Sequence, residues 1–197
     1  LANPMKFLII GGVFGIAGFS AIFALDFLPS AIYIIILYIY PSLIVLYSLF
    51  TGKPVPKLIW LGLPLTFLGL FLTVFNFQSL LTINPVGFII TIINSLAICV
   101  YFILSERNFS GLQSKLPGTR WMLLGAMIFS LLWIPFLGLR IPSSLLGWSM
   151  LIGLGIFGTM IPILLVNVGL QLIGAARGSV IVSLQPVFTV LISTLFL

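Results

Sequence analysis

The sequence predicts an all-α integral membrane protein, built as a polytopic helix bundle. Of its 197 residues, 61% are hydrophobic and only 5% are charged, and the mean hydropathy is +1.38. Soluble domains carry about 25% charged residues, so a water-soluble fold could not bury this much apolar surface. Long uncharged runs also recur along the chain. These runs are continuous rather than alternating, which favours helices over the short strands of a membrane β-barrel.

The uncharged runs divide into about seven membrane-spanning helices. A bilayer core about 30 Å thick needs about 20 apolar residues of helix. The run between Lys57 and Glu106 is long enough for two spans, which the polar, proline-bearing stretch 76–85 separates. The predicted helices cover residues 7–25, 31–50, 58–76, 86–104, 121–138, 148–170 and 177–196. Both acidic residues of the chain, Asp26 and Glu106, are then expected in loops.

Lysine and arginine residues fall almost entirely on one side of this topology. Seven of the eight lie on the same side as Lys6, and only Arg140 lies on the other. Because cytoplasmic loops carry an excess of Lys and Arg, we expect this side to face the cytoplasm, with the protein in the cell (inner) membrane. The net charge of +6 then reflects orientation in the lipid bilayer, and no nucleic acid partner is expected.

Two proline-bearing helices indicate a duplicated unit. Pro41 lies inside the predicted helix 31–50 and Pro186 inside 177–196, and the two prolines are 145 residues apart. The two helices cross the membrane in opposite directions, so the copies are inverted, as in many secondary transporters that bind substrate near mid-membrane. We interpret the matched prolines as kinks beside a central cavity. The same shift pairs Leu25 with Leu170, Ile36 with Ile181 and Val45 with Val190.

The chain contains a loose pattern of four features in order. A helix end is followed by a short loop, then a proline-bearing helix, then Gly and a charged residue. The matching stretches are IFALDFLPSAIYIIILYIYPSLIVLYSLFTGKPVPKLIWLGLPLTFLGLFL and GLQLIGAARGSVIVSLQPVFTVLISTLF. They resemble the EamA-type carriers of the drug/metabolite transporter superfamily. The resemblance implies two inverted five-helix repeats, of which the chain would hold the third to the ninth helix. Residues 1–76 would end the first repeat, and 77–197 would begin the second. The family commonly shows Gly-Glu after the first proline-bearing helix, whereas Gly52 is followed here by Lys53.

Side chains that serve catalysis or metal binding are scarce. The chain has no His, one Cys and two acidic residues, so acid–base catalysis, a catalytic triad and a Cys cluster for a metal lack their parts. No G-x-x-x-x-G-K-[ST] phosphate-binding loop occurs. We therefore expect no enzyme activity, no catalytic residue, no metal site and no cofactor.

Polar and kink-forming residues at membrane depth are the remaining candidates for a substrate site. An amide or hydroxyl in hydrocarbon needs a partner, so such side chains are expected to face a cavity or another helix. For Asn94 and Gln185 a hydrogen bond between helices is an equal alternative. Arg177 is interpreted as an anchor at the inside end of its helix, with an anion contact as the alternative. The predicted cavity-lining residues are Tyr38, Tyr40, Pro41, Asn94, Tyr101, Gln185 and Pro186.

Together with the resemblance, these residues predict a secondary transporter that moves small organic solutes by alternating access. An exporter of amino acids or related metabolites is the favoured form. The alternative is a non-transporting membrane scaffold or assembly protein, whose bundle would lack a water-accessible cavity. The expected partners are a small-molecule substrate and the lipid bilayer, and a homodimer stays open.

Overall fold

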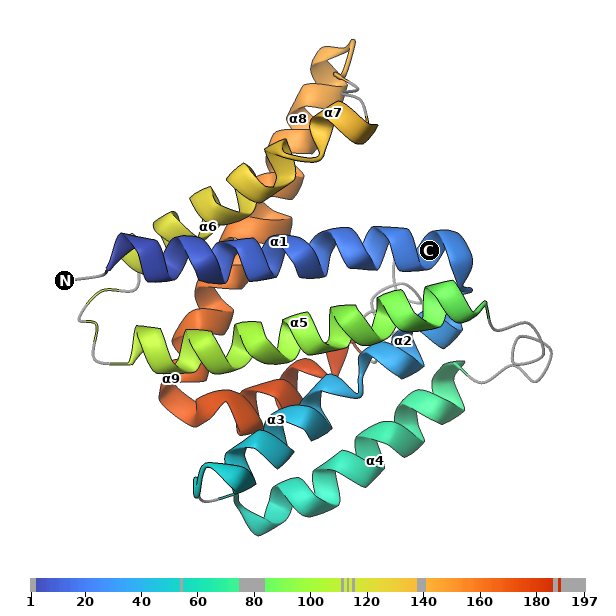
Figure 1. The fold of residues 1–197 in the computed structure, drawn as a ribbon, viewed down its shortest axis with the longest axis vertical. Helices are drawn as coiled ribbons and strands as arrows, with labels where there is room; N and C mark the ends of the chain where they lie inside the picture. Colours follow the sequence, from blue (N-terminus) through green and yellow to red (C-terminus); the bar gives the residue numbers. More distant parts are fainter. Residues whose placement is uncertain are drawn as a thin grey trace.

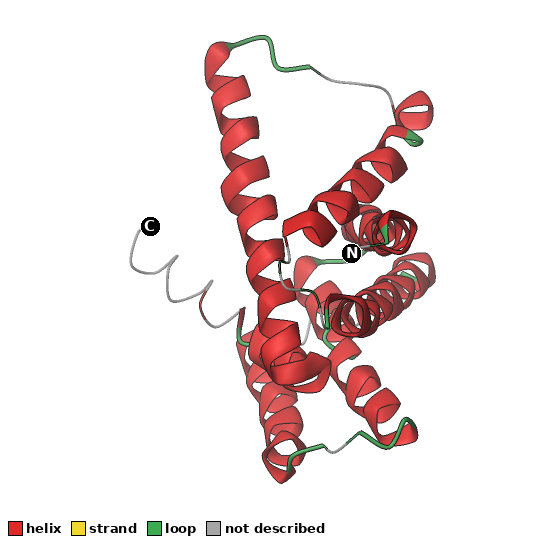
Figure 2. Cartoon of the chain, turned by 90° about the vertical axis from the view of Figure 1, so that its left-hand side faces the viewer, coloured by secondary structure: helices red, strands yellow, loops and turns green. Residues whose placement is uncertain are grey.

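The computed structural model of the chain is helical throughout its described part, where the connections are short and no strand occurs (Figure 2). It describes residues 3–53, 55–74, 84–110, 112, 114, 116–137, 141–185 and 188. The elements are α1 (Pro4–Phe27), α2 (Ser30–Leu37), α3 (Tyr40–Phe50), α4 (Lys57–Val74), α5 (Pro85–Phe109), α6 (Leu116–Leu131), α7 (Ile134–Leu137), α8 (Leu145–Gly153), the π-helical segment η2 (Leu154–Met160) and α9 (Ile161–Val182).

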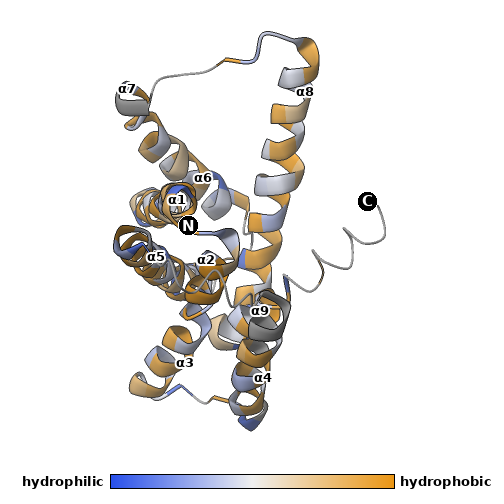
Figure 3. Ribbon diagram, turned by 90° about the vertical axis from the view of Figure 1, so that its right-hand side faces the viewer, coloured by the Kyte–Doolittle hydropathy of each residue, from blue (hydrophilic) through white to orange (hydrophobic). Residues whose placement is uncertain are grey.

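Four helical stretches are long and apolar enough to cross a membrane. They agree with the predicted class of membrane helix bundle, whereas seven spans remain a prediction. The last stretch runs through α8, η2 and α9, and its exposed surface is largely apolar (Figure 3). The four stretches are Pro4–Phe27, Ser30–Phe50, Pro85–Phe109 and Leu145–Val182.

The prediction that both acidic residues lie in loops is wrong. Asp26 belongs to the last turn of α1, and Glu106 belongs to α5, which continues to Phe109. The uncharged runs underestimate helix length because a helix continues past the apolar core of a bilayer. Glu106 is also compensated by Lys53, whose Nζ lies 2.6 Å from its Oε2.

Helix α5 is the centre of the bundle and packs against α1, α2, α3 and α9 (Figure 1). On the far side of α1 lies α6. These two helices approach closely because a glycine of each helix faces the backbone of the other. A Cβ added at Gly11 would meet the carbonyl oxygen of Met122, and one added at Gly125 would meet that of Leu8. Small residues allow helices in lipid to pack at such short range.

Two helix breaks occur at equivalent places in the chain. Between α2 and α3, the amide of Ile39 donates to the carbonyl of Ile36 at 3.2 Å. At the end of α9, the amide of Leu184 donates to the carbonyl of Ile181 at 3.1 Å. Donor and acceptor are each shifted by 145 residues, the spacing of the two prolines. Two further pairs of bonds correspond in the same way. The amide of Tyr38 donates to the carbonyl of Ile34, as that of Ser183 does to Ser179. The amide of Leu43 donates to the carbonyl of Ile39, as that of Phe188 does to Leu184.

Proline explains the first break. Pro41 has no N–H to donate to the carbonyl of Leu37, and its ring clashes with that carbonyl in a continuous helix. Accordingly α2 ends at Leu37, and α3 begins at Tyr40 with Pro41 in its first turn, where the missing N–H costs nothing. Val182, the last residue of α9, also lies four residues before a proline. That proline, Pro186, lies outside the described residues.

A third change of direction occurs inside α9. Gly174 has φ 82° and ψ 163°, a backbone conformation open mainly to glycine. This residue falls between the predicted helices 148–170 and 177–196, and here it lies within α9 rather than in a loop. At the shift of 145 residues, Gly174 corresponds to Pro29, which stands between α1 and α2.

One end of the bundle gathers most of the basic residues (Figure 1, left). Phe7 near the start of α1 stacks edge-on against Phe109 at the end of α5, with ring centroids 4.8 Å apart, and Gly118 lies beside both rings. The Lys53–Glu106 ion pair adds the connection between α3 and α4 to this end. We call it the basic end; Lys6, Arg107 and Arg120 lie in the same helix ends.

Replacing Gly11 with alanine should destabilise the bundle, whereas the same change at Gly12 should not. A Cβ at Gly11 would also lie 2.8 Å from the amide nitrogen of Ala126, whereas a Cβ at Gly12 would meet nothing within 4 Å. Overpacking of this kind costs about 1–3 kcal/mol. We expect Gly11→Ala to lower the Tm measured in detergent micelles, and Gly12→Ala to leave it unchanged or raise it slightly. Equal Tm values would contradict the close contact.

Candidate functional site

A cavity of about 200 Å³ lies where α1, the α2–α3 break, α5 and the end of α9 meet. Both helix breaks contribute to it: Tyr38 and Tyr40 come from the first break, and Gln185 follows the second. Of the seven predicted site residues, four therefore meet here: Tyr38, Tyr40, Tyr101 and Gln185. The apolar lining residues are Phe14, Leu37, Ile98, Phe102, Pro162, Ile163, Val166 and Val182.

Aromatic rings form most of the wall. The ring centroids of Tyr38 and Tyr40 lie 5.8 Å apart, and those of Tyr40 and Phe102 lie 5.5 Å apart. Tyr101 continues the series, 5.3 Å from Phe14 and 5.7 Å from Phe102. These separations are typical of favourable aromatic pairs, so each ring is held in place by its neighbours.

A buried hydrogen bond holds Tyr101 in this wall. Its hydroxyl donates to Oδ1 of Asn167 at 3.1 Å, and Asn167 is fully buried at 0% exposure. The Nδ2 of Asn167 lies 3.8 Å from the sulfur of Met122. One asparagine thus connects α5, α9 and α6 directly behind the cavity. The sequence alone does not pair Asn167 with Tyr101, since nothing in it shows which tyrosine this amide meets.

Asn94 lies elsewhere. Its Nδ2 donates to the carbonyl of Ala17 at 3.0 Å and to the hydroxyl of Tyr33 at 3.2 Å, and it is not among the residues that line the cavity. Asn94 thus makes hydrogen bonds between helices, which was the alternative to lining the cavity. Its Oδ1 is buried and has no hydrogen-bond partner in the described part of the chain.

The other predicted residues have separate places. Pro41 is buried beside Tyr40 and shapes the break rather than the cavity surface, and Pro186 lies outside the described residues. Arg177 is exposed at the basic end. There it borders a second pocket, of about 290 Å³, which we call the basic pocket. Its other lining residues include Ser48, Lys53, Glu106 and Gly174.

The cavity and the basic pocket lie at different levels of the same three helices. Along α3 the cavity is lined by Tyr40 and the basic pocket by Ser48. Between these levels α3, α5 and α9 carry Ile44, Ser105 and Ser179, each at 0% exposure. The cavity is therefore separated from the basic pocket by closely packed side chains, and the Lys53–Glu106 pair lies beyond them.

The Lys53–Glu106 pair is a feature that sequence reasoning missed. The sequence marks Lys53 only as a departure from the Gly-Glu pattern, and it predicts Glu106 in a loop. Their opposite charges on the same predicted side were the available signal. The apolar lining residues gave no signal, because the whole sequence is apolar. Among the described residues, no group of three His, Cys, Asp or Glu side chains could hold a metal ion.

Comparison with known proteins gives one match. Residues 85–197 match the model of the EamA-like transporter family. The matched part begins with α5 and includes α9, so it contains Tyr101, Asn167 and Gln185. No curated protein and no solved structure matches the chain.

Tyr101→Phe and Asn167→Leu should show energetic coupling. Each single change leaves a buried polar group without its partner, which costs about 1–3 kcal/mol. The double variant removes both groups, so it should cost less than the sum by about 0.6 kcal/mol, the average for such pairs in membranes. Unfolding by SDS titration measures this difference. As a control, Tyr101→Phe is combined with Ser149→Ala, an exposed site on α8, and these two losses of unfolding free energy should add. Additive losses for Tyr101→Phe and Asn167→Leu would contradict the hydrogen bond.

Proposed function

The chain belongs to the EamA-like transporter family, and from this premise we propose that it is a secondary transporter of small organic solutes. The family transports drugs and metabolites, so a membrane transporter rather than an enzyme is the general function. We propose alternating access as the mechanism and export of amino acids or related metabolites across the cell (inner) membrane as its use. The observation that carries this proposal is the aromatic cavity at the two matched helix breaks.

The lining of the cavity favours a small solute without a net charge. Among the described residues that line it none is charged, and the polar ones are three tyrosines and one glutamine. The α2–α3 break adds a backbone group, because the carbonyl of Leu37 loses the donor that a continuous helix would supply at Pro41. Broken helices in transporters bind substrates and ions through such ends. A zwitterion could use a freed carbonyl for its ammonium group.

The matched breaks also support an inverted repeat. Backbone hydrogen bonds recur at a spacing of 145 residues, and Pro29 and Gly174 stand at equivalent turns. We propose that residues 1–76 belong to one repeat and 77–197 to the other. In such proteins one repeat rocks against the other around a site that lies between them, and the cavity draws its lining from both ranges.

On this proposal, the Lys53–Glu106 pair holds the basic end closed. Lys53 belongs to the first range and Glu106 to the second, so the pair joins the two proposed repeats. It lies beyond the packed layer of Ile44, Ser105 and Ser179. Opening the cavity towards the basic end would require the pair to separate, so the structure corresponds to a conformation closed at that end.

A scaffold or assembly role is the competing function, and cysteine labelling separates the two. In a Cys99→Ala background, Gln185→Cys and Tyr40→Cys should react with a water-soluble maleimide, because a carrier's cavity admits water. Leu172→Cys is the control, since Leu172 is 78% exposed on the apolar surface and would face lipid. A transported amino acid or metabolite should slow the reaction at both cavity positions, 40 and 185. Absence of labelling at both cavity sites would favour the scaffold.

Charge reversal tests the closed basic end. Lys53→Glu and Glu106→Lys each place like charges together, which should open this end and raise labelling of Gln185→Cys from that side of the membrane. A partly exposed ion pair contributes up to about 1 kcal/mol, so we expect about a fivefold change in the open fraction. The double reversal should restore the wild-type rate. Lys57→Glu, outside the pair, is the control, and no rescue by the double variant would contradict the mechanism.

A further inference from the structure

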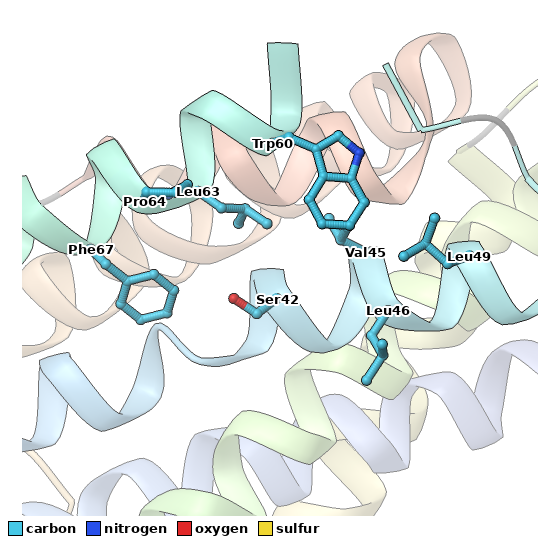
Figure 4. Close-up of a pocket in the computed structure, with 8 residues that line it drawn as sticks. All are labelled: Ser42, Val45, Leu46, Leu49, Trp60, Leu63, Pro64 and Phe67. Carbon is cyan, nitrogen blue, oxygen red and sulfur yellow. The ribbon is translucent and has the colours of Figure 1, made fainter. Parts of the chain in front are cut away.

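A third hollow, larger than the cavity and the pocket beside Arg177, lies on the outside of the bundle, between α3 and α4. It has a volume of about 340 Å³, and the eight described residues that line it are apolar or aromatic apart from Ser42. Figure 4 shows the rings of Trp60 and Phe67 projecting from α4 towards α3, with Leu49 at one end and Ser42 near the other. We call this hollow the α3–α4 groove. It is distinct from the aromatic cavity, since no described residue lines both.

The groove exists because α4 does not follow α3 closely. Helix α4 packs mainly against α2 and α9, and side chains of α3 that face the groove stay about half exposed. Leu46 is 48% exposed and Leu49 is 42% exposed, while Trp60 opposite them is 53% exposed. Large apolar side chains at this exposure, on helices of a membrane protein, contact hydrocarbon rather than water.

The two ends of the groove differ in charge. Phe67 and Ser42 lie at the end near the helix break, deep in the apolar region, whereas Leu49 and Trp60 lie towards the basic end. Lys57 stands one helical turn before Trp60, so the two side chains share a face of α4. Lys57 is exposed and makes no ion pair with any described residue. Tryptophan and lysine in this arrangement are typical of the membrane interface.

We propose that the α3–α4 groove binds one acyl chain of an anionic phospholipid, whose phosphate group pairs with Lys57. The apolar walls accept the chain, and Lys57, which is unpaired among the described residues, selects the headgroup by charge at the mouth. Basic residues beside membrane helices attract anionic lipids in this way. The open position is Lys57 rather than Lys53, because Glu106 already neutralises Lys53 at 2.6 Å.

Quenching of Trp60 by brominated lipids tests this site. Bromine on an acyl chain quenches tryptophan fluorescence on contact. The purified chain is placed in phosphatidylcholine vesicles that contain increasing fractions of either brominated phosphatidylglycerol or brominated phosphatidylcholine. Because the chain has four tryptophans, the signal of Trp60 is taken as the difference between the wild type and Trp60→Phe. Trp60 is exposed, so this change should not disturb the fold, and circular dichroism verifies that.

We expect the anionic lipid to quench Trp60 at about a fivefold lower mole fraction than the zwitterionic one, the effect of one lysine near the membrane surface. Lys57→Gln should remove this preference, and Lys6→Gln should keep it. Lys6 is an equally exposed lysine on α1 at the same end of the bundle, so it is the matched control. Equal quenching by both lipids would overturn headgroup selection. Absence of any quenching of Trp60 would show that protein covers the groove, and would overturn the proposal altogether.

Discussion

A hydrogen bond that Pro41 cannot donate shapes the centre of this bundle. In hydrocarbon a free backbone carbonyl has no water to bind, so a helix broken at that depth needs other structure around it. The break after Leu37 brings Tyr38 and Tyr40 next to a cavity, and α5 packs across it. The equivalent break at the end of α9 delivers Gln185 to the same cavity. The two matched breaks thus lie where the interior of the protein is open.

The remaining contacts keep the helices close enough to enclose that opening. Glycines bring α1 and α6 into backbone contact, and buried polar side chains fix α5 relative to its neighbours. Asn94 binds α5 to α1 and α2, whereas Asn167 binds it to α9. Such bonds are modest individually in membranes, but each has a definite geometry. The apolar surfaces alone, which lipid solvates equally well, would not specify one arrangement.

Much of the fold could be predicted from the sequence, because an uncharged run and a proline are properties of the chain itself. The length of the run gives the helix, and Pro41 gives the break. Partners in space could not be predicted. Asn94 and Tyr101 share a face of α5, yet they lie about 10 Å apart along its axis. One therefore meets Tyr33 and the other meets Asn167. The ion pair of Lys53 and Glu106 was missed for the same reason.

Oδ1 of Asn94, which has no hydrogen-bond partner among the described residues, bears on the relative populations of conformations. A buried acceptor without a donor raises the free energy of the state that contains it by about 1–3 kcal/mol. The described conformation has this cost at Oδ1, at a site where α1, α2 and α5 meet. A second conformation in which a small slide of α1 supplied a donor would avoid the cost, and 1.4 kcal/mol corresponds to a tenfold change in population. In the proposed alternating-access cycle, an asparagine remote from the cavity would thereby influence how evenly the two states are occupied.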